Sequence, residues 1–276
     1  VTNVRPFWKN DEKLEIHCGN GITAYPSNEM HKIKRGTVIQ TKNSRYSTPS
    51  IHRWQEFHEG LIIDQNLPSM VATQVLDPKP GERILDVCAG AGRKTTHIAQ
   101  CMINDGKIIA IDRSKNKLAK LEGRIKRMGI NCVQPVHSKI KNIKDNIGEK
   151  KFDKILIDPP CSALGLRPKI YFNKSKAELD NYKINQERIF RHVMEIVHHG
   201  TKIVYCTCTI TREENEHVLE HFLDEFDMKV LSPGIHIGHP GIQTERLSKT
   251  EVKKFIRFYP GLEDTIGFFI ALLEKK

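Results

Sequence analysis

The chain has 276 residues, of which 38% are hydrophobic and 28% charged, and its formal net charge is +11. That length suits one large α/β domain with an appendage. No apolar run reaches the roughly 18 residues of a membrane helix. Seven cysteines without a CxxC pair argue against a disulfide framework or a zinc knuckle. We therefore expect no membrane contact, no bound metal and a reducing, cytoplasmic location; nothing in the sequence indicates the oligomeric state.

The basic charge also bears on the partner. Lysine and arginine neutralise phosphates and release counterions, so a net charge of +11 favours a nucleic acid. Basic residues recur in clusters, one of which runs from Lys115 to Arg127. A generally lysine-rich, solvated surface would give the same composition, and this alternative stays open.

The first 50 residues differ from the rest of the chain. Two short β-like pieces, KLEIHC at 13–18 and GTVIQT at 36–41, are separated by Gly19-Asn20-Gly21 and by Pro26. Glycine and proline interrupt strands. We expect the end of a small β-rich domain over residues 1–28 and a connector over residues 29–60.

From residue 61 onward, strand-like and helix-like segments alternate. Strands are predicted at 83–88, 107–112, 132–136, 152–158, 202–208 and 266–273, and helices from 94, at 115–128 and at 186–199. This alternation predicts an α/β fold with a mainly parallel, doubly wound sheet over residues 61–276. Ligands of such sheets bind at the carboxyl ends of the strands.

Small residues form the turn after the first of these strands. Gly90 and Gly92 let backbone N–H groups approach a ligand at the start of a helix. Asp112 ends the next strand, about 20 residues on, where a carboxylate can accept both ribose hydroxyls of an adenosyl cofactor. Asp112 could instead cap the following helix. This turn alone does not distinguish NAD from S-adenosylmethionine.

Two cysteines follow two later strands. Cys161 belongs to Asp158-Pro159-Pro160-Cys161, and Cys208 belongs to Thr207-Cys208-Thr209. Because both motifs end strands, we expect the two thiols to share one crevice. Two thiols beside a carboxylate indicate covalent chemistry on an electron-poor ring, with one thiol attacking and the other assisting. Inert packing is the ordinary use of a buried cysteine.

Four ordered stretches carry a resemblance to a known family. They are DVCAGAGRKTTHIAQ at 86–100, AIDRSKNKLAKL at 110–121, FDKILIDPPCSALGLRPK at 152–169 and VYCTCTITREENEHV at 204–218. They resemble the successive motifs of the NOL/NOP/Sun family, which are RNA cytosine-5 methyltransferases dependent on S-adenosylmethionine. The resemblance covers roughly residues 60 to 276.

The resemblance extends to one branch of that family. KLEIHCGNGITAY at 13–25 and DTIGFFIALLEKK at 264–276 are most similar to the animal branch with an inserted PUA domain. That branch methylates a cytosine near the 3′ acceptor end of certain tRNAs. The resemblance implies that residues 1–28 are the end of a PUA-like RNA-binding domain, most of which is missing from this chain.

The resemblance also implies a Rossmann-like fold, S-adenosylmethionine as cofactor, and RNA, with tRNA expected, as partner. Cys208 matches the family nucleophile, Cys161 the cysteine that releases product, and Asp158 the acid that contacts the target ring. Lys94 matches a lysine of the catalytic centre. The expected cofactor residues are Cys88, Ala89, Gly90, Ala91, Gly92, Arg93, Lys94, Asp112 and Asp158.

Two departures from the family pattern leave alternatives open. Arg93 stands where the family usually has glycine, and it is expected to crowd the cofactor or to change the backbone. The segment 136–139 lacks the acid that reads adenine in the family, and the next acid is Asp145. A catalytically silent RNA-binding descendant is therefore one alternative. A DNA cytosine methyltransferase, in which Cys161 would attack, is the other.

Three acids follow the Cys208 motif. Glu213, Glu214 and Glu216 flank Asn215. Carboxylates are favourable in the first turn of a helix because of the helix dipole. We expect these acids to begin a helix and to take no part in catalysis.

Overall fold

The computed structural model describes residues 13–16, 19–23, 39–44, 51–148, 151–167 and 174–276. The chain forms two compact units. The N-terminal unit comprises Val1–Ile51 and Pro168–Asn173, and the large unit comprises His52–Arg167 and Lys174–Lys276. The part of the chain that is described contains no helix long and apolar enough to cross a membrane.

The N-terminal unit contains a three-stranded antiparallel sheet of β1 (Lys13–Ile16), β2 (Gly19–Thr23) and β3 (Ile39–Ser44), in that order. The expectation that Gly19-Asn20-Gly21 interrupts the strands is wrong, because these residues begin β2. Pairing with a strand on each side orders this glycine-rich segment, and a register shift occurs between Asn20 and Gly21. The assignment of residues 1–28 to a PUA-like domain stays a prediction.

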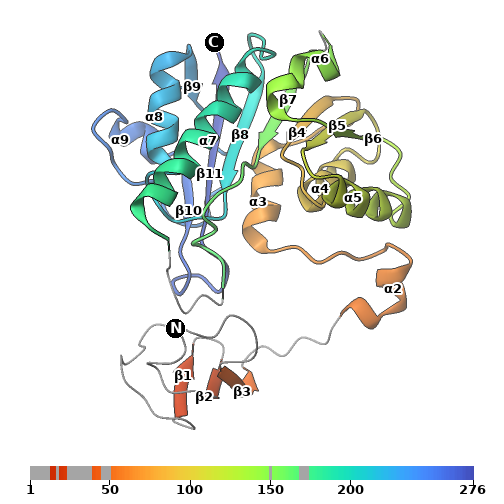
Figure 1. Cartoon of the computed structure of the whole chain (residues 1–276), viewed down its shortest axis with the longest axis vertical. Helices are drawn as coiled ribbons and strands as arrows, with labels where there is room; N and C mark the ends of the chain where they lie inside the picture. The colour runs from red at the N-terminus through yellow and green to blue at the C-terminus, as the bar shows by residue number, and fades with distance from the viewer. Residues whose placement is uncertain (1–12, 17–18, 24–38, 45–50, 149–150, 168–173) are drawn as a thin grey trace. The chain divides into compact units, whose positions relative to one another are not determined.

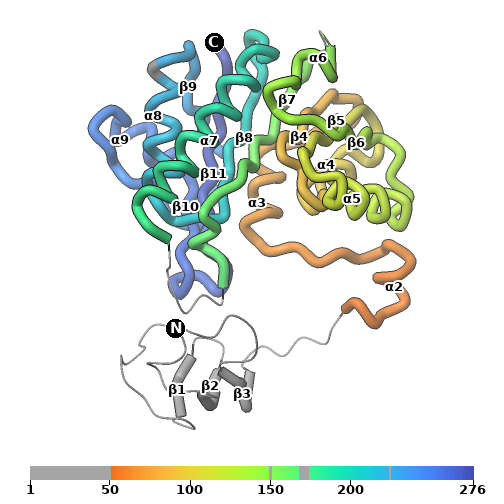
Figure 2. The backbone as a smooth tube through the Cα atoms, viewed as in Figure 1, coloured from red at the N-terminus to blue at the C-terminus, as the bar shows by residue number. Residues whose placement is uncertain are grey.

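The large unit is built on one sheet with the strand order β10-β11-β8-β7-β4-β5-β6 (Figure 1). Five strands are parallel: β4 (Arg83–Val87), β5 (Lys107–Asp112), β6 (Val133–His137), β7 (Lys154–Ile157) and β8 (Lys202–Thr207). The predicted α/β fold with a mainly parallel, doubly wound sheet is therefore confirmed. From β4 the chain proceeds to β5 and β6 on one side and later returns to β7 and β8 on the other (Figure 2). The strand order reverses between β4 and β7, where such sheets bind ligands.

An antiparallel edge completes the sheet. β11 (Phe268–Lys275) runs antiparallel to β8, to β10 (Ile256–Phe258) and to β9 (Met228–Val230). The last strand was predicted at 266–273, whereas β9 and β10 were not predicted. Each has only three residues, so pairing with β11 orders them rather than a sequence pattern of their own.

Helices cover both faces of the sheet. The larger ones are α3 (Leu67–Leu76), α4 (Arg93–Cys101), α5 (Lys115–Arg127), α7 (Lys176–Met194) and α8 (Glu216–Glu225). Short helices are η1 (Ile51–Arg53), α2 (Gln55–His58), η2 (Ile140–Asn142), α6 (Ile143–Ile147) and α9 (Lys249–Val252). Residues of α3 and α4 share one buried cluster with alternate residues of the strands, and residues of α6, α7 and α8 share the other.

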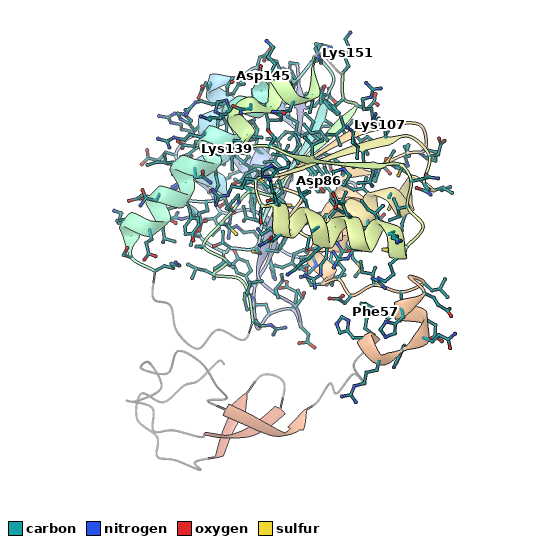
Figure 3. The ribbon with its side chains drawn as sticks, turned by 45° about the vertical axis from the view of Figure 1, so that its right-hand side comes forward. Phe57, Asp86, Lys107, Lys139, Asp145 and Lys151 are labelled. Carbon is teal, nitrogen blue, oxygen red and sulfur yellow. The ribbon has the colours of Figure 1, made fainter. Side chains whose placement is uncertain are left out.

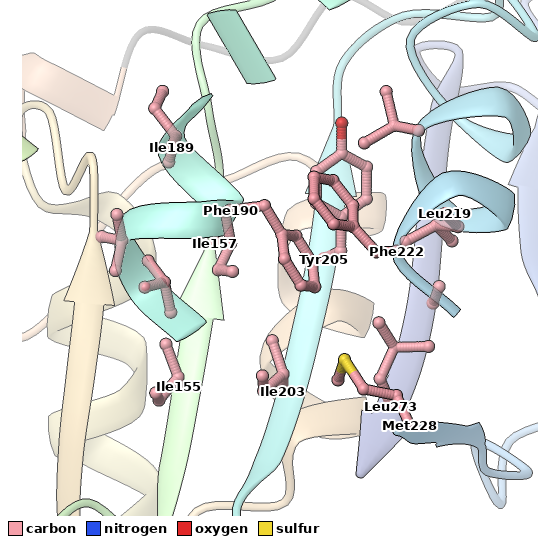
Figure 4. Packing of buried hydrophobic residues seen from close by; sticks show 14 of the residues in the cluster. Ile155, Ile157, Ile189, Phe190, Ile203, Tyr205, Leu219, Phe222, Met228 and Leu273 are labelled. Atoms are coloured by element: carbon pink, nitrogen blue, oxygen red, sulfur yellow. The ribbon is translucent and has the colours of Figure 1, made fainter. Parts of the chain in front are cut away.

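Aromatic packing joins α7 and α8 to the sheet. Phe190 stacks on Phe222 with ring centroids 4.1 Å apart, and Tyr205 of β8 lies 6.3 Å from Phe190 (Figure 4). Burial of such large rings is a main source of core stability. This packing fixes α7 and α8 against each other and against β8.

The helix predicted at 186–199 is α7, but its bounds differ. It begins ten residues earlier because Ser175 and Glu178 form a reciprocal capping box. It ends at Met194, before His198. The first turns of α7 are polar, so the apolar spacing that reveals a helix is weak there.

Candidate active site

A cavity of about 700 Å³ opens at the carboxyl ends of the five parallel strands. Residues that follow each of these strands line it, together with part of α7. Every predicted site residue except Gly92 is on its wall: Cys88, Ala89, Gly90, Ala91, Arg93, Lys94, Asp112, Asp158, Cys161 and Cys208. The fold thus brings together motifs that lie up to 120 residues apart in the sequence (208 − 88 = 120).

The backbone shapes the glycine turn. Cys88, Gly90 and Gly92 have φ angles of 64°, 60° and 81°, in the left-handed region that glycine adopts most readily. A Cβ on Gly92 would lie 2.1 Å from Cδ1 of Leu121. Gly92 is thus packed closely against α5. It does not line the cavity. Its conformation directs the start of α4 toward the cavity.

Asp112 holds this turn in place. One carboxylate oxygen accepts the N–H of Gly90 at 2.9 Å and the other accepts the N–H of Ser114 at 2.8 Å. The alternative that Asp112 caps α5 is wrong, because the N-cap is Ser114. Each carboxylate oxygen has a second lone pair, so Asp112 retains acceptors for a ligand.

Arg93 directly follows the glycine turn. It is the first residue of α4 and does not have a positive φ, so a glycine is not needed at this position. Its guanidinium pairs with Asp64 at 2.8 Å, with the Arg93 side chain 53% exposed. Arg93 therefore requires no unusual backbone at its own position, and the expectation that it crowds the cofactor or changes the turn stays a prediction. The guanidinium is held by Asp64 beside the cavity.

The segment after β6 supplies no acid to the cavity wall. Ser138, Lys139, Ile140 and Lys141 line it, and Asp145 does not. Asp145 lies in α6, apart from Asp86 and Lys139 in Figure 3. The wall is thus basic at the segment where the resemblance implied a carboxylate that reads adenine. Within the described ranges no group of three or more potential metal ligands occurs.

Lys94 and Asp158 form an ion pair across the cavity floor. Nζ of Lys94 lies 2.6 Å from a carboxylate oxygen of Asp158, and the side chains are 12% and 30% exposed. Burial disfavours the Lys94 cation, but the pairing with Asp158 outweighs it and the pKa of Lys94 is raised. Lys94 therefore carries its positive charge at neutral pH and neutralises the carboxylate beside it.

A second carboxyl, Asp86, lies in β4 and was not predicted as a site residue. It is buried and accepts a hydrogen bond from the Thr95 hydroxyl at 2.5 Å. Burial raises the pKa of Asp86 to about 7, and the charge of Asp158 adds to this rise. Its sequence signal is a charged residue inside an apolar strand, RILDV.

The two predicted cysteines lie in contact. The sulfur atoms of Cys161 and Cys208 are 3.3 Å apart. The hydrogen bond between them and burial raise the pKa of Cys161, whereas the same hydrogen bond lowers the pKa of Cys208. The nearby cation of Lys94 also favours the Cys208 thiolate. The lowered pKa makes Cys208 the better candidate for the nucleophilic thiolate of the pair.

The acids after Cys208 are not a solvated first turn. Glu216 begins α8, but Glu214, Asn215 and Glu216 are completely buried. Glu216 forms a two-point ion pair with the buried Arg257, which also donates to the carbonyl of Ile210 at 2.9 Å. The expectation that the acids begin a helix is confirmed for Glu216, the first residue of α8. Glu214 and Glu216 in addition have buried partners that hold the loop carrying Cys208.

Comparison with known proteins agrees with the fold and the motifs. The profile of the family described as "16S rRNA methyltransferase RsmB/F" matches residues 73–274. A tRNA (cytosine(72)-C(5))-methyltransferase from Pyrococcus horikoshii is 38% identical over 257 residues, which cover 93% of this chain and 63% of that protein. The human tRNA (cytosine(72)-C(5))-methyltransferase NSUN6 is 31% identical over 306 residues, which cover 97% of this chain and 65% of that protein.

A solved structure is similar over nearly the whole chain. The crystal structure of NSun6 from Pyrococcus horikoshii with SFG has a TM-score of 0.77 and 37% identity, and covers 97% of this chain and 68% of that one. The chain thus spans somewhat less than two thirds of the two curated relatives above. The resemblance stated from the motifs is confirmed: the chain belongs to the RsmB/F (NOL/NOP/Sun) family of methyltransferases.

Proposed function

We propose that this chain transfers a methyl group from S-adenosylmethionine to the 5-carbon of a cytosine in RNA through a covalent cysteine–cytosine adduct. The observation that carries the proposal is the pair of sulfur atoms, 3.3 Å apart, on the same cavity wall as the Lys94–Asp158 ion pair. Two relatives named as tRNA cytosine-5 methyltransferases support the reaction and the substrate class.

The cavity fits the proposed cofactor. The positive φ angles at Cys88, Gly90 and Gly92 bring the main chain close to the ligand space at the start of α4. Asp112 has acceptors suited to ribose hydroxyls. We propose that the 88–94 turn, Asp112 and Asp158 hold the cofactor. When bound, S-adenosylmethionine supplies an electrophilic methyl group.

The roles of the protein side chains follow from the chemistry of cytosine. The 5-carbon becomes nucleophilic when the Cys208 thiolate forms a bond to the 6-carbon. Asp158, held by Lys94, orients the ring and stabilises the charge that develops on it. After the methyl group is attached, a solvent base takes the proton from the 5-carbon, the electron pair of that C–H bond restores the double bond between the 5- and 6-carbons, and the Cys208 sulfur leaves as a thiolate. We assign to Cys161 the assistance of this last step, because its sulfur lies 3.3 Å from that of Cys208 and can donate a hydrogen bond to the departing thiolate. A paired base cannot reach the cavity, so the target is unpaired or flipped out.

The substrate and location form the finer part of the proposal. We propose a tRNA, methylated near its 3′ acceptor end, because two relatives are named for cytosine 72 of tRNA. The net charge of +11 supports a polyanionic substrate. A cytoplasmic location is consistent with the six free cysteines of the described residues.

A silent RNA-binding protein is the second candidate function. The basic wall at Lys139 and Lys141, where the family has an acid, favours it. The intact pairs Cys161–Cys208 and Lys94–Asp158 favour the enzyme. Calorimetric titration with S-adenosylmethionine separates the two candidates, since the silent protein needs no affinity for it.

A covalent-adduct assay tests the proposed reaction. Wild type, Cys161→Ala and Cys208→Ala are incubated with tRNA and S-adenosylmethionine and then denatured. We expect a stable protein–RNA band with Cys161→Ala alone, because Cys208 attacks and release is blocked. Cys101→Ala is the matched control, because Cys101 lies off the cavity.

Other outcomes contradict the proposal in distinct ways. A band with Cys208→Ala alone would make Cys161 the attacking thiol, as in DNA cytosine methyltransferases. RNA binding with neither an adduct in any variant nor methyl transfer by the wild type would favour the silent RNA-binding protein.

A further inference from the structure

Glu214 lies buried between the two loops that carry the cysteines. Its exposed fraction is 0%. One carboxylate oxygen accepts the N–H of Ser162 at 2.8 Å and the side-chain amide of Gln186 at 3.0 Å. The other accepts the hydroxyls of Ser162 and Thr211, the latter at 3.1 Å. A carboxylate has acceptors only, and each of these four contacts supplies a donor.

These hydrogen bonds reach the neighbours of both cysteines. Ser162 follows Cys161 in the chain, and its hydroxyl lies 2.9 Å from that of Thr209, which follows Cys208. Gln186 also donates to the carbonyl of Pro160 at 3.1 Å, so the residues on both sides of Cys161 are held. Glu214 is therefore the centre of a network that fixes one cysteine loop against the other.

The two residues that follow Glu214 act differently. Asn215 bonds to the hydroxyl of Thr207 and to the carbonyl of Thr209, both within the Cys208 loop. Glu216 pairs with Arg257 of β10. Glu214 thus connects to the Cys161 loop through the N–H and the hydroxyl of Ser162.

We propose that Glu214 is a positioning residue whose carboxylate sets the separation between the Cys161 and Cys208 sulfur atoms. In the reaction proposed above, on which this role in catalysis rests, the separation decides whether Cys161 can assist release after Cys208 has attacked. Misplacement of a reacting group by 1 Å can reduce a rate by about 100-fold. A buried network of side chains prevents such drift because every member is fixed by several partners.

Thiol reactivity tests this role without RNA or cofactor. Wild type, Glu214→Ala, Cys161→Ala and the double variant are alkylated with iodoacetamide over a range of pH, and modification of Cys208 is followed by mass spectrometry. We expect the wild-type Cys208 thiol to react at lower pH than in Cys161→Ala, because the Cys161 sulfur, 3.3 Å away, can donate a hydrogen bond to a Cys208 thiolate. We expect Glu214→Ala to move the profile to higher pH. If the profile moves by about one in pH, the rate of modification at a fixed pH below the pKa falls about tenfold.

The double variant distinguishes a loss of positioning of the two sulfur atoms from a general loss of structure. If Glu214 acts through the contact between the two sulfur atoms, its removal adds little once Cys161 is already alanine. Two controls should keep the wild-type profile. Glu213→Gln makes the charge change of Glu214→Gln at the neighbouring, partly exposed residue, and Val230→Ala weakens the core at the edge strand β9, which does not line the cavity.

Two milder variants decide the matter if Glu214→Ala does not fold. Thr209→Val removes only the hydroxyl contact to Ser162 and should move the profile in the same direction by a smaller amount. Glu214→Gln should retain most of the wild-type behaviour. Its amide oxygen can accept from Ser162 N–H and Gln186, while the two hydroxyls turn to accept from its NH₂ group.

The proposal is overturned if a folded Glu214→Ala has the wild-type profile, or if its effect adds fully to that of Cys161→Ala. If Glu214→Ala does not fold, a wild-type profile for Thr209→Val overturns it. Thermal unfolding monitors folding in every variant. Because the assay uses neither RNA nor S-adenosylmethionine, the network can be confirmed even if the adduct experiment refutes the proposed methyl transfer.

Discussion

The main chain shapes one wall of the cavity, whereas buried side chains shape the other. In the first, the glycine wall (residues 88–94 with Asp112), φ angles and backbone N–H groups define the surface. In the second, the cysteine wall (residues 158–165 and 207–211), side chains of α7 and of 214–216 hold each loop. A wall made by the main chain tolerates new side chains at positions where the φ angle is not positive. A wall held by side chains depends on the identity of each of them.

Arg93 and Glu214 illustrate this difference. Arg93 stands where the resemblance implies a glycine, and a glycine is not required there because the position is helical and the guanidinium reaches Asp64. Glu214 has no comparable freedom, because its carboxylate accepts four hydrogen bonds in a fully buried position. The comparison predicts a large loss of folding stability for substitutions behind the cysteine wall. Along the glycine wall it predicts a loss that differs from one residue to the next.

The largest effect is expected for Arg257→Met. This change leaves the buried carboxylate of Glu216 without its cation and the Ile210 carbonyl without its donor. Breaking a buried ion pair from one side lowers the free energy of unfolding by about 3–5 kcal/mol. Urea denaturation measures this loss.

An exposed ion pair provides the control for that prediction. Lys276 pairs with Asp227, and the two side chains are 52% and 66% exposed. Lys276→Met should cost less than about 1 kcal/mol. Equal losses in the two variants would show that Arg257 does not brace the cysteine wall.

A smaller loss of folding stability is expected for Gly92→Ala in the glycine wall. The residue has a φ of 81°, and its Cβ would lie 2.1 Å from the Leu121 side chain. Overpacking and an unfavourable φ together should cost about 1–3 kcal/mol, measured by thermal unfolding. Gly123→Ala is the matched control, because Gly123 lies inside α5 with nothing within 4 Å of the added Cβ. It should raise stability by up to about 1 kcal/mol. If Gly92→Ala left stability unchanged or raised it, as expected for Gly123→Ala, the close packing of the turn would be refuted.

The smallest effect is expected for Arg93→Gly, which restores the residue that the family usually has. Only a half-exposed ion pair with Asp64 is lost, so stability should change by less than about 1 kcal/mol. Calorimetric affinity for S-adenosylmethionine should stay the same, because the guanidinium is held beside the cavity. Clearly tighter binding by the glycine variant would show instead that Arg93 crowds the cofactor.

The sequence by itself determined the sheet and the position of its motifs. Apolar runs at β4, β5, β7 and β8 alternate with helical spacing, and this alternation predicts parallel strands whose carboxyl ends meet at one edge. Cys161, Cys208 and Asp158 follow such strands directly, so their gathering in one cavity follows from topology alone.

Only the tertiary structure decided how the cysteines are held. Glu214 and Ser162 are 52 residues apart, and Arg257 and Glu216 are 41 residues apart. Local reasoning therefore assigned the acids to the start of a helix and did not reveal their buried partners. The three-residue strands β9 and β10 are likewise defined by pairing with β11. Periodicity and local motifs depend on neighbours in the chain, whereas the burial of a charged side chain depends on partners that only the complete fold brings into contact.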